Sequence, residues 1–389
     1  YNGCLPMRSL SGLRLLQSTR VFRLVAWWLI AGSLAGLLAK ESSASPQPVA
    51  VLSGICDASA AVALGPDDAF VVADDEDEVL DSKNNDKIGS LPFRVYRLSL
   101  PGRPVLTGSL PGKALDPTLG TKGELDLEGS ARIGDLIYWI GSHSAGKEAK
   151  EAPNRRRLFA VQLKLQSDRL EVVPVGKPYK TLLEDLFKDP RYDQFNLEAA
   201  SRKESKKVPN EKDPNEKGKN NLSGLSIEGL AANSEGELLI GFRNPVRDGK
   251  ALVVTLKNPK EVMAGKPARF SAPVQLALNG MGIRSMELIQ GQIYIVAGPP
   301  GDPKLNAAGT GPLKPHVLYR WSGRGSDQPV PMTNADLGGS FPEALFAMNS
   351  RIYHLSDDGK VLMNGQACGE LKRTEDRQFR AFSLPLPLR

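Results

Sequence analysis

Short apolar runs recur along this chain, and each is bounded by Gly, Pro, Asn or Asp. Many of these runs alternate apolar and polar residues, which is the pattern of β-strands. A repeated unit organises them: an acid–Gly pair opens one strand, a turn follows, and a second strand ends in Ile-Gly before a polar loop. The clearest copies are residues 126–144 and 226–244, where Glu128 and Glu228 stand at the same distance from the glycine that ends the second strand.

Further copies extend this pattern along the chain. They begin at Asp57, at Gly282, where Arg284 replaces the glutamate, and near Phe341, where Glu343 is the acid. A third apolar strand follows in each copy, in the last one only as a weak run at residues 360–365, and often a fourth. The pattern predicts an all-β fold, a β-propeller of about five four-stranded blades, with a β-sandwich as the alternative. Residues 196–201 resemble the opening of a sixth, degenerate blade, so the expected number is five or six.

Two segments interrupt the repeats. Residues 201–221 are charged and contain no aromatic residue, so they cannot bury enough apolar surface to fold, and we expect a disordered insertion there. Residues 179–189 have apolar positions at helical spacing and predict a short helix that caps one face. The acidic run at residues 74–78 occupies the loop after the second strand of the first unit.

The first 44 residues differ from the rest. Four arginines lead into an uncharged apolar stretch at residues 24–39, and small residues around Ser42 and Ala44 follow. This order predicts a secretory signal region at residues 1–44, with Met7 as the start and cleavage near Ser45. A retained membrane anchor is the alternative, although the stretch is shorter than the roughly twenty residues that span a bilayer. We therefore expect a periplasmic or secreted protein whose single propeller domain covers residues 45–389, with no stable membrane anchor after cleavage.

Charge and cysteine placement add two constraints. The formal net charge is +6, and the first 44 residues carry an excess of four positive charges, which leaves +2 for the rest. A nearly neutral body lacks the basic surface that nucleic acid requires. Cys56 and Cys368 lie near the two ends of the mature chain, where an oxidising compartment would allow one disulfide. Two separate buried thiols remain an equal alternative.

Several stretches of the sequence resemble one bacterial family. These stretches are CDASAAVAL with FVVADDEDEVL, ELDLEGSARIGDLIYWIGSHS, and LSIEGLAA with GELLIGFRNPV and KALVVTLKNP. In this order they are similar to the family called domain of unknown function 3616, and the resemblance extends from about Ile55 to the C-terminus. The resemblance implies a propeller-like, exported protein, and it supplies neither a reaction nor catalytic residues. The acid–Gly strand openings are more distantly similar to propellers described as phytase-like esterases.

If the repeats superimpose, one residue of each unit faces the central channel. This ring comprises Ser59, Glu128, Glu228, Arg284 and Glu343. Asp57 and Asp126 precede it by two residues and point to the same side of their strands. Carboxylates crowded in this way raise one another's pKa unless a cation joins them. Calcium or another divalent cation bound by Glu128, Glu228 and Glu343 is one interpretation. A buried polar network closed by Arg284 is the other, and the sequence slightly favours it.

Loops after the second strands place further polar residues near this ring. Asp75 could reach a ligand, Arg243 could clamp a carboxylate or phosphate, and His143 could act as general acid or base. The sequence therefore predicts an exported propeller that binds an unknown ligand, such as an anionic small molecule, at the channel mouth. The alternative is a metal-dependent hydrolase, either a phosphoesterase or a phytase-like esterase, acting on an anionic substrate.

Overall fold

The computed structural model describes residues 46–65, 67–73, 90–115, 125–204, 224–301 and 304–387. All of them belong to one compact unit, Ser45–Arg389. The predicted signal region, Asp75 and the other residues of the acidic run, and most of the charged insertion lie outside the described residues. None of the described helices is long and apolar enough to cross a membrane.

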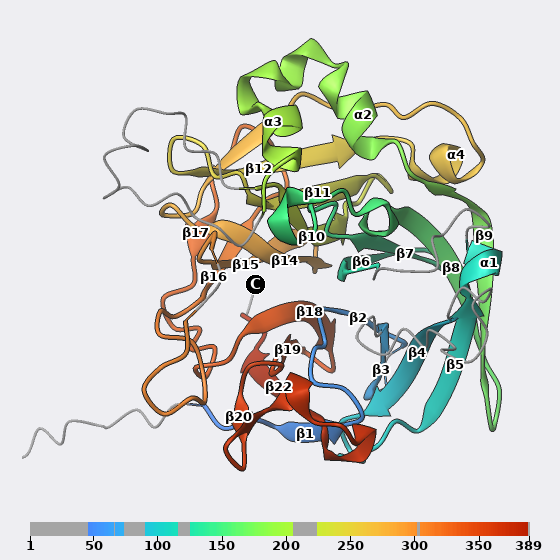
Figure 1. The fold of residues 1–389 in the computed structure, drawn as a ribbon, viewed down its shortest axis with the longest axis vertical. Coiled ribbons are helices and arrows are strands. Elements are labelled where there is room, and N and C mark those ends of the chain that lie inside the picture. Colours follow the sequence, from blue (N-terminus) through green and yellow to red (C-terminus); the bar gives the residue numbers. More distant parts are fainter. Residues whose placement is uncertain are drawn as a thin grey trace, which may run out of the picture. The chain divides into compact units, whose positions relative to one another are not determined.

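The described chain forms five four-stranded antiparallel sheets, the blades of a propeller (Figure 1). Blade 1 contains β2 (Ala60–Ala63), β3 (Ala69–Ala73), β4 (Ser90–Arg97) and β5 (Leu106–Pro111). Blade 2 contains β6 (Leu127–Ile133), β7 (Leu136–Gly141), β8 (Leu158–Leu165) and β9 (Leu170–Tyr179). Blade 3 contains β10 (Ser226–Ala232), β11 (Leu238–Asn244), β12 (Lys250–Leu256) and β13 (Val274–Ala277). Blade 4 contains β14 (Gly282–Ile289), β15 (Gln292–Gly298), β16 (Val317–Trp321) and β17 (Val330–Pro331). Blade 5 contains β18 (Pro342–Met348), β19 (Arg351–Ser356), β22 (Gln378–Pro385) and β1 (Ala50–Ser53).

The first strand of each sequence repeat is the innermost strand of its blade. Strands β2, β6, β10, β14 and β18 each contact the next, and β18 contacts β2, so the ring closes. The predicted five-bladed propeller is confirmed. A sixth blade at residues 196–201 is wrong, because Leu197–Ser201 form the helix α3. Its Leu197 and Ala200 are buried in the core beside blade 3 instead of pairing with a strand.

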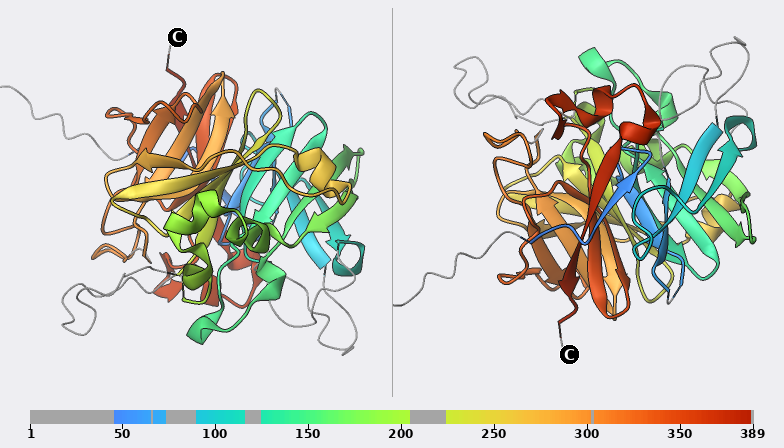
Figure 2. Two further views of the ribbon diagram at one scale, coloured as in Figure 1. Left: turned by 90° about the horizontal axis from the view of Figure 1, so that it is seen from above. Right: turned by 90° about the horizontal axis from the view of Figure 1, so that it is seen from below.

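The fifth blade closes with strands from both ends of the domain. Strand β1 pairs with β22 along its whole length, and Figure 2 shows these two strands side by side. Residues 360–365, expected as the third strand of this unit, instead contribute β20 (Leu362–Met363) to a small hairpin with β21 (Gln366–Ala367). The expectation fails because β22, an unassigned segment further along the chain, pairs with β19 and fills that place.

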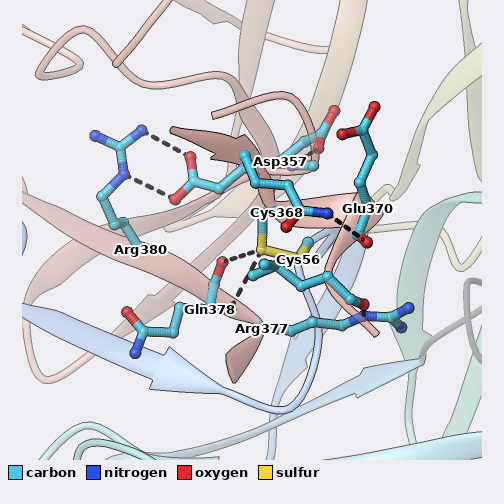
Figure 3. The surroundings of a disulfide bond; sticks show 11 residues. Cys56, Asp357, Cys368, Glu370, Arg377, Gln378 and Arg380 are labelled. Atoms are coloured by element: carbon cyan, nitrogen blue, oxygen red, sulfur yellow. Dashed lines mark hydrogen bonds and ion pairs between the residues drawn. A yellow bond between two sulfur atoms is a disulfide. The ribbon is translucent and has the colours of Figure 1, made fainter. Parts of the chain in front are cut away.

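A disulfide joins Cys56 and Cys368 next to this closure (Figure 3). Cys56 lies between β1 and β2, and Cys368 follows the β20–β21 hairpin. The bond therefore links the chain's entry into blade 1 to the last part of blade 5.

Helical segments lie between the strands. The α-helices are α1 (Gly112–Leu115), α2 (Leu182–Phe187), α3 (Leu197–Ser201) and α4 (Pro259–Met263). The 3-10 helices are η1 (Lys147–Ala149), η2 (Pro153–Arg155), η3 (Pro190–Phe195), η4 (Cys368–Glu370) and η5 (Thr374–Asp376). Helix α2 lies within the segment predicted to be helical, and Leu182 and Leu186 of α2 join a core that also includes Leu252 of blade 3.

The glycine of the repeated Glu–Gly pair has a packing role. A Cβ atom added to Gly229 would lie 2.7 Å from Cγ2 of Ile283 on the neighbouring blade. One added to Gly129 would lie 2.9 Å from Cβ of Leu230. Contacts this short are not tolerated in a close-packed interior. Glycine therefore allows adjacent innermost strands to approach each other.

Candidate functional site

Four of the five predicted ring residues occupy β-bulges. The pairing register skips one residue between Leu127 and Gly129 in β6, and equivalent skips occur in the other three strands. The skipped residues at these positions are Glu128, Glu228, Arg284 and Glu343. A bulge leaves one residue outside the ladder and re-aims its side chain. Four innermost strands, β6, β10, β14 and β18, therefore each direct one polar side chain to the same end of the channel. We call this end the channel mouth.

Arg284 connects two of the ring carboxylates. Its Nη1 lies 2.8 Å from Oε2 of Glu228, and its Nη2 donates to Oε1 of Glu343. Arg284 is only 3% exposed, and both glutamates are buried. Burial and the nearby Arg243 lower the pKa of Arg284, while the carboxylate of Glu228 opposes that shift. These contacts correspond to the buried network that the sequence slightly favoured.

Arg243 on β11 also binds the Glu228 side chain. Its Nη1 donates to Oε1 of Glu228 at 2.6 Å, while Nε and Nη2 donate to the carbonyl oxygens of Pro300 and Gly301 at 3.1 and 2.6 Å. The side chain is buried. Because its guanidinium is enclosed by these acceptors, the geometry gives no support to Arg243 as a clamp for an anionic substrate.

Glu343 also belongs to a group of three carboxylates. Oxygen atoms of Asp57, Glu343 and Asp357 all lie within 4.8 Å of one another. Ser59 bridges two of them, since its Oγ is 2.5 Å from Oδ1 of Asp57 and 2.9 Å from Oε2 of Glu343. Burial raises the pKa of Asp357, although the Gly359 amide donates to this carboxylate and opposes the shift. We refer to Asp57, Glu343 and Asp357 as the acidic triad.

The disulfide holds the two chain segments that carry part of this triad. Cys56 directly precedes Asp57, and its carbonyl oxygen accepts a hydrogen bond of 2.9 Å from the amide of Asp358. Asp358 itself is paired by Arg380 through two bonds of 2.7 Å. Figure 3 shows Asp357 close to the disulfide. The covalent bond and these contacts position Asp57 and Asp357 relative to each other.

Glu128 differs from the other ring glutamates. Among the described residues it has neither a hydrogen bond nor an ion pair. Burial raises its pKa well above the ordinary value, and repulsion from Glu228 and Asp126 adds to the shift. Asp126 is turned toward Arg155, at 3.1 Å, and also accepts a bond of 3.3 Å from Ser144. The burial of Glu128 and its acidic neighbours therefore favour its protonated form.

The predicted catalytic histidine is fully buried. His143 adopts a positive φ of 55°, and its Nδ1 lies 2.9 Å from the carbonyl oxygen of Gly141. Burial lowers its pKa to about 4, so the ring is neutral at pH 7. Without exposed surface, this ring does not reach a ligand at the mouth in this structure, and a catalytic role gains no support from the geometry.

Two residues at the mouth were not assigned a role from the sequence. Asp357 completes the acidic triad, and its place in the loop after a second strand was the available signal. His316, just before β16, is 6% exposed and has no hydrogen-bond partner for either ring nitrogen within the described part of the chain. A Cβ at Gly298 would lie 2.3 Å from its Cδ2, so the glycine makes room for this ring. No sequence pattern pointed to His316.

The family comparison agrees with the repeats. Residues 113–333, more than half of the chain, match the family model described as protein of unknown function (DUF3616). The chain belongs to this family. The match includes blades 2, 3 and 4, whose Glu128, Glu228 and Arg284 lie at the mouth. No curated protein matches the sequence.

Several solved structures are similar to this chain at low scores. A GH43_1 enzyme from Xanthomonas citri is 10% identical, with a TM-score of 0.43 and coverage of 88% of this chain and 90% of the enzyme. An exo-β-1,3-galactanase from Phanerochaete chrysosporium is 8% identical, with a TM-score of 0.41. In that comparison 88% of this chain is covered, but only 64% of the galactanase. A GH43 endo-arabinanase from Bacillus licheniformis is 8% identical, with a TM-score of 0.38 and coverage of 85% and 94%. At these scores the likeness carries no argument about function.

Proposed function

We propose that this protein is an exported propeller that binds a cationic ligand at the channel mouth, and that a divalent cation such as calcium occupies the acidic triad. The observation that carries the proposal is the approach of three carboxylate oxygens to within 4.8 Å of one another. Calcium binds oxygen ligands at about 2.3–2.6 Å, so two ligands of one ion lie at most about 5 Å apart. The spacing of the triad is within that limit.

The charges around the triad support a cation over an anion. Arg284 bonds directly to only one of its members, Glu343, and that arginine is shared with Glu228. The mouth therefore holds more acidic side chains than arginines, and repulsion from Glu228, Asp126 and Asp57 contributes to the raised pKa of Glu128. A divalent cation would relieve this repulsion, whereas the anionic small molecule expected from the sequence would increase it.

The hydrolase alternative has one favourable observation. Glu128 is a carboxyl whose raised pKa suits a general acid, and it stands near carboxylates paired with arginine. A cation on the triad could activate water. An anionic substrate would need a free guanidinium, but Arg243 and Arg284 are both engaged by protein acceptors. Ligand binding is therefore the better-supported function.

Calcium should raise the melting temperature of the purified full chain relative to the same protein in chelator. A ligand that binds only the folded state at 100 times its Kd stabilises it by about 2.7 kcal/mol. The substitution Asp357→Asn should remove most of this rise, because it replaces one triad carboxylate by a neutral amide of the same shape. Thermal melts with calcium and with chelator, together with equilibrium dialysis of calcium, provide the measurement.

The matched control is Asp168→Asn, an exposed aspartate in the β8–β9 turn, which should respond to calcium like the unmodified chain. Glu128→Gln should also retain the response, because Glu128 is outside the triad. If the unmodified chain neither retains calcium in dialysis nor gains thermal stability from it, cation binding at the triad is refuted.

A further inference from the structure

A cleft of about 900 Å³ lies between blades 2 and 3, away from the channel mouth. It is bordered by the turn between β6 and β7, at the opposite end of β6 from Glu128, and by helix α4. Figure 1 shows α4 beside the outer strand β9 of blade 2. A volume near 900 Å³ is within the roughly 300–1,000 Å³ typical of small-molecule sites.

The inner part of this cleft contains a tyrosine hydroxyl group without a partner. Tyr138 lines the cleft and is only 1% exposed. Within the described part of the chain its hydroxyl makes no hydrogen bond, so it is available to a ligand in the cleft. Burial raises the pKa of Tyr138, so the hydroxyl stays protonated and can donate at neutral pH. The cleft wall also includes the amide of Gln162.

The walls around Tyr138 are apolar. Ile133, Leu136 and Val175 line the cleft and are partly buried against the core beneath it. These three side chains offer contact to a hydrocarbon or aromatic group. Burial of such a group would be favourable at about 25 cal/mol per Å² of apolar surface.

The rim of the cleft is positively charged. Lys257, Lys260 and Lys266 line it, and none of them forms a side-chain ion pair with another described residue. Arg269 also lines the cleft, but it is paired with Glu261 at 2.8 Å. Of the other lining residues, Asp135 alone is acidic, so the lysines give the rim a net positive charge.

We propose that this cleft binds a small organic anion with an apolar body, such as a medium-chain carboxylate. The apolar walls take the body, the lysines of the rim attract the anionic group, and Tyr138 donates a hydrogen bond to a polar atom of the ligand. The site is separate from the channel mouth and does not depend on cation binding there.

The fluorescent anion 8-anilinonaphthalene-1-sulfonate, which has an aromatic body and one sulfonate, is a suitable probe for the full chain. We expect saturable binding at a ratio of one to one, with displacement by dodecanoate. Tyr138→Phe should weaken binding about 5- to 10-fold, the effect of one hydrogen bond. The double substitution Lys257→Gln with Lys260→Gln should weaken it further and reduce its dependence on salt, because fewer charges remain to be screened.

The matched control is Lys250→Gln with Lys314→Gln, two exposed lysines outside the cleft lining, and it should bind like the unmodified chain. Thermal melts of every variant establish that each one is folded before binding is compared, and dodecanoate should raise the melting temperature of the unmodified chain. The proposal is overturned if no saturable binding occurs. It is equally overturned if both lysine pairs have the same effect, or if uncharged dodecanol displaces the probe as well as dodecanoate does.

Discussion

At the scale of single residues, the histidines are notable because all three are buried. The chain contains only His143, His316 and His354. Burial lowers their pKa values to about 4, about 3 and about 4, respectively. In the unfolded chain each would regain an ordinary pKa near 6.5. Between these values the unfolded chain binds more protons than the folded one, so stability is complete above about pH 6.5 and falls as the pH decreases.

Replacing one of these histidines by an apolar residue should flatten this dependence. His316→Leu is the clearest choice, since neither ring nitrogen has a hydrogen-bond partner to lose among the described residues. Between pH 7 and pH 5 the variant should lose about 2 kcal/mol less stability than the unmodified chain, because about 1.5 pH units of titration below the unfolded pKa are removed. Urea unfolding at both pH values, in chelator, measures the change, and unfolding at pH 8 isolates the effect on packing. An unchanged slope with pH would contradict the neutral, buried state of His316.

At the scale of structural elements, the Glu–Gly pair at the start of an innermost strand has two separate roles. The bulge at Glu128 or Glu228 re-aims the carboxylate toward the mouth, and the glycine that follows allows the next blade to approach. One dipeptide thus couples the packing of neighbouring blades to the placement of a polar side chain. Both roles are filled by the same pair in blades 2 and 3, where the Glu–Gly pair recurs.

Gly229→Ala should therefore destabilise the propeller. The added methyl group would meet Ile283 and Met286 of blade 4 at 2.7 and 3.0 Å, and over-packing of this kind typically costs about 1–3 kcal/mol. The control is Gly65→Ala, where an added Cβ would have no neighbour within 4 Å, and its effect should be within about 0.5 kcal/mol. Urea unfolding of the two variants measures the difference. Equal stabilities would show that the blades separate easily enough to accept the methyl group.

At the scale of the whole domain, ring closure depends on strand pairing and on a covalent bond. Strand β1 pairs with β22, and the disulfide joins residues separated by 312 positions in the sequence. Both features connect the two ends of the propeller. The disulfide also lies beside Asp357 (Figure 3), and Cys56 directly precedes Asp57 in the sequence, so closure of the ring and geometry of the acidic triad are linked.

Removing the disulfide should weaken both properties. The double variant Cys56→Ser with Cys368→Ser should lose on the order of 4–5 kcal/mol of stability, as expected for a cross-link over so long a loop. Its melting temperature should also respond less to calcium, because Asp57 is held less firmly. Urea unfolding and thermal melts with calcium test both effects. Peptide mapping without reductant is the check on the bond itself, and recovery of both thiols in free form would contradict it.

The sequence alone determined the class of the fold and the family. Strand periodicity is a local property, and the repeated spacing between Glu128 and Gly141 or between Glu228 and Gly241 records a supersecondary unit that must stack on its neighbours. For the same reason the repeats by themselves assign equivalent positions to four residues of the ring, namely Glu128, Glu228, Arg284 and Glu343.

Tertiary structure decided which of these residues have partners. Arg243 of blade 3 donates to the carbonyl oxygens of Pro300 and Gly301, which follow β15 of blade 4. No local sequence pattern records such a contact between blades. The replacement of residues 360–365 by β22 likewise depends on closure of the ring by strands from both ends of the domain. Pairing, burial and the pKa shifts that follow from them depend on distances between segments far apart in the chain. The acidic triad and the unusual carboxyl of Glu128 could therefore emerge only once the blades were assembled.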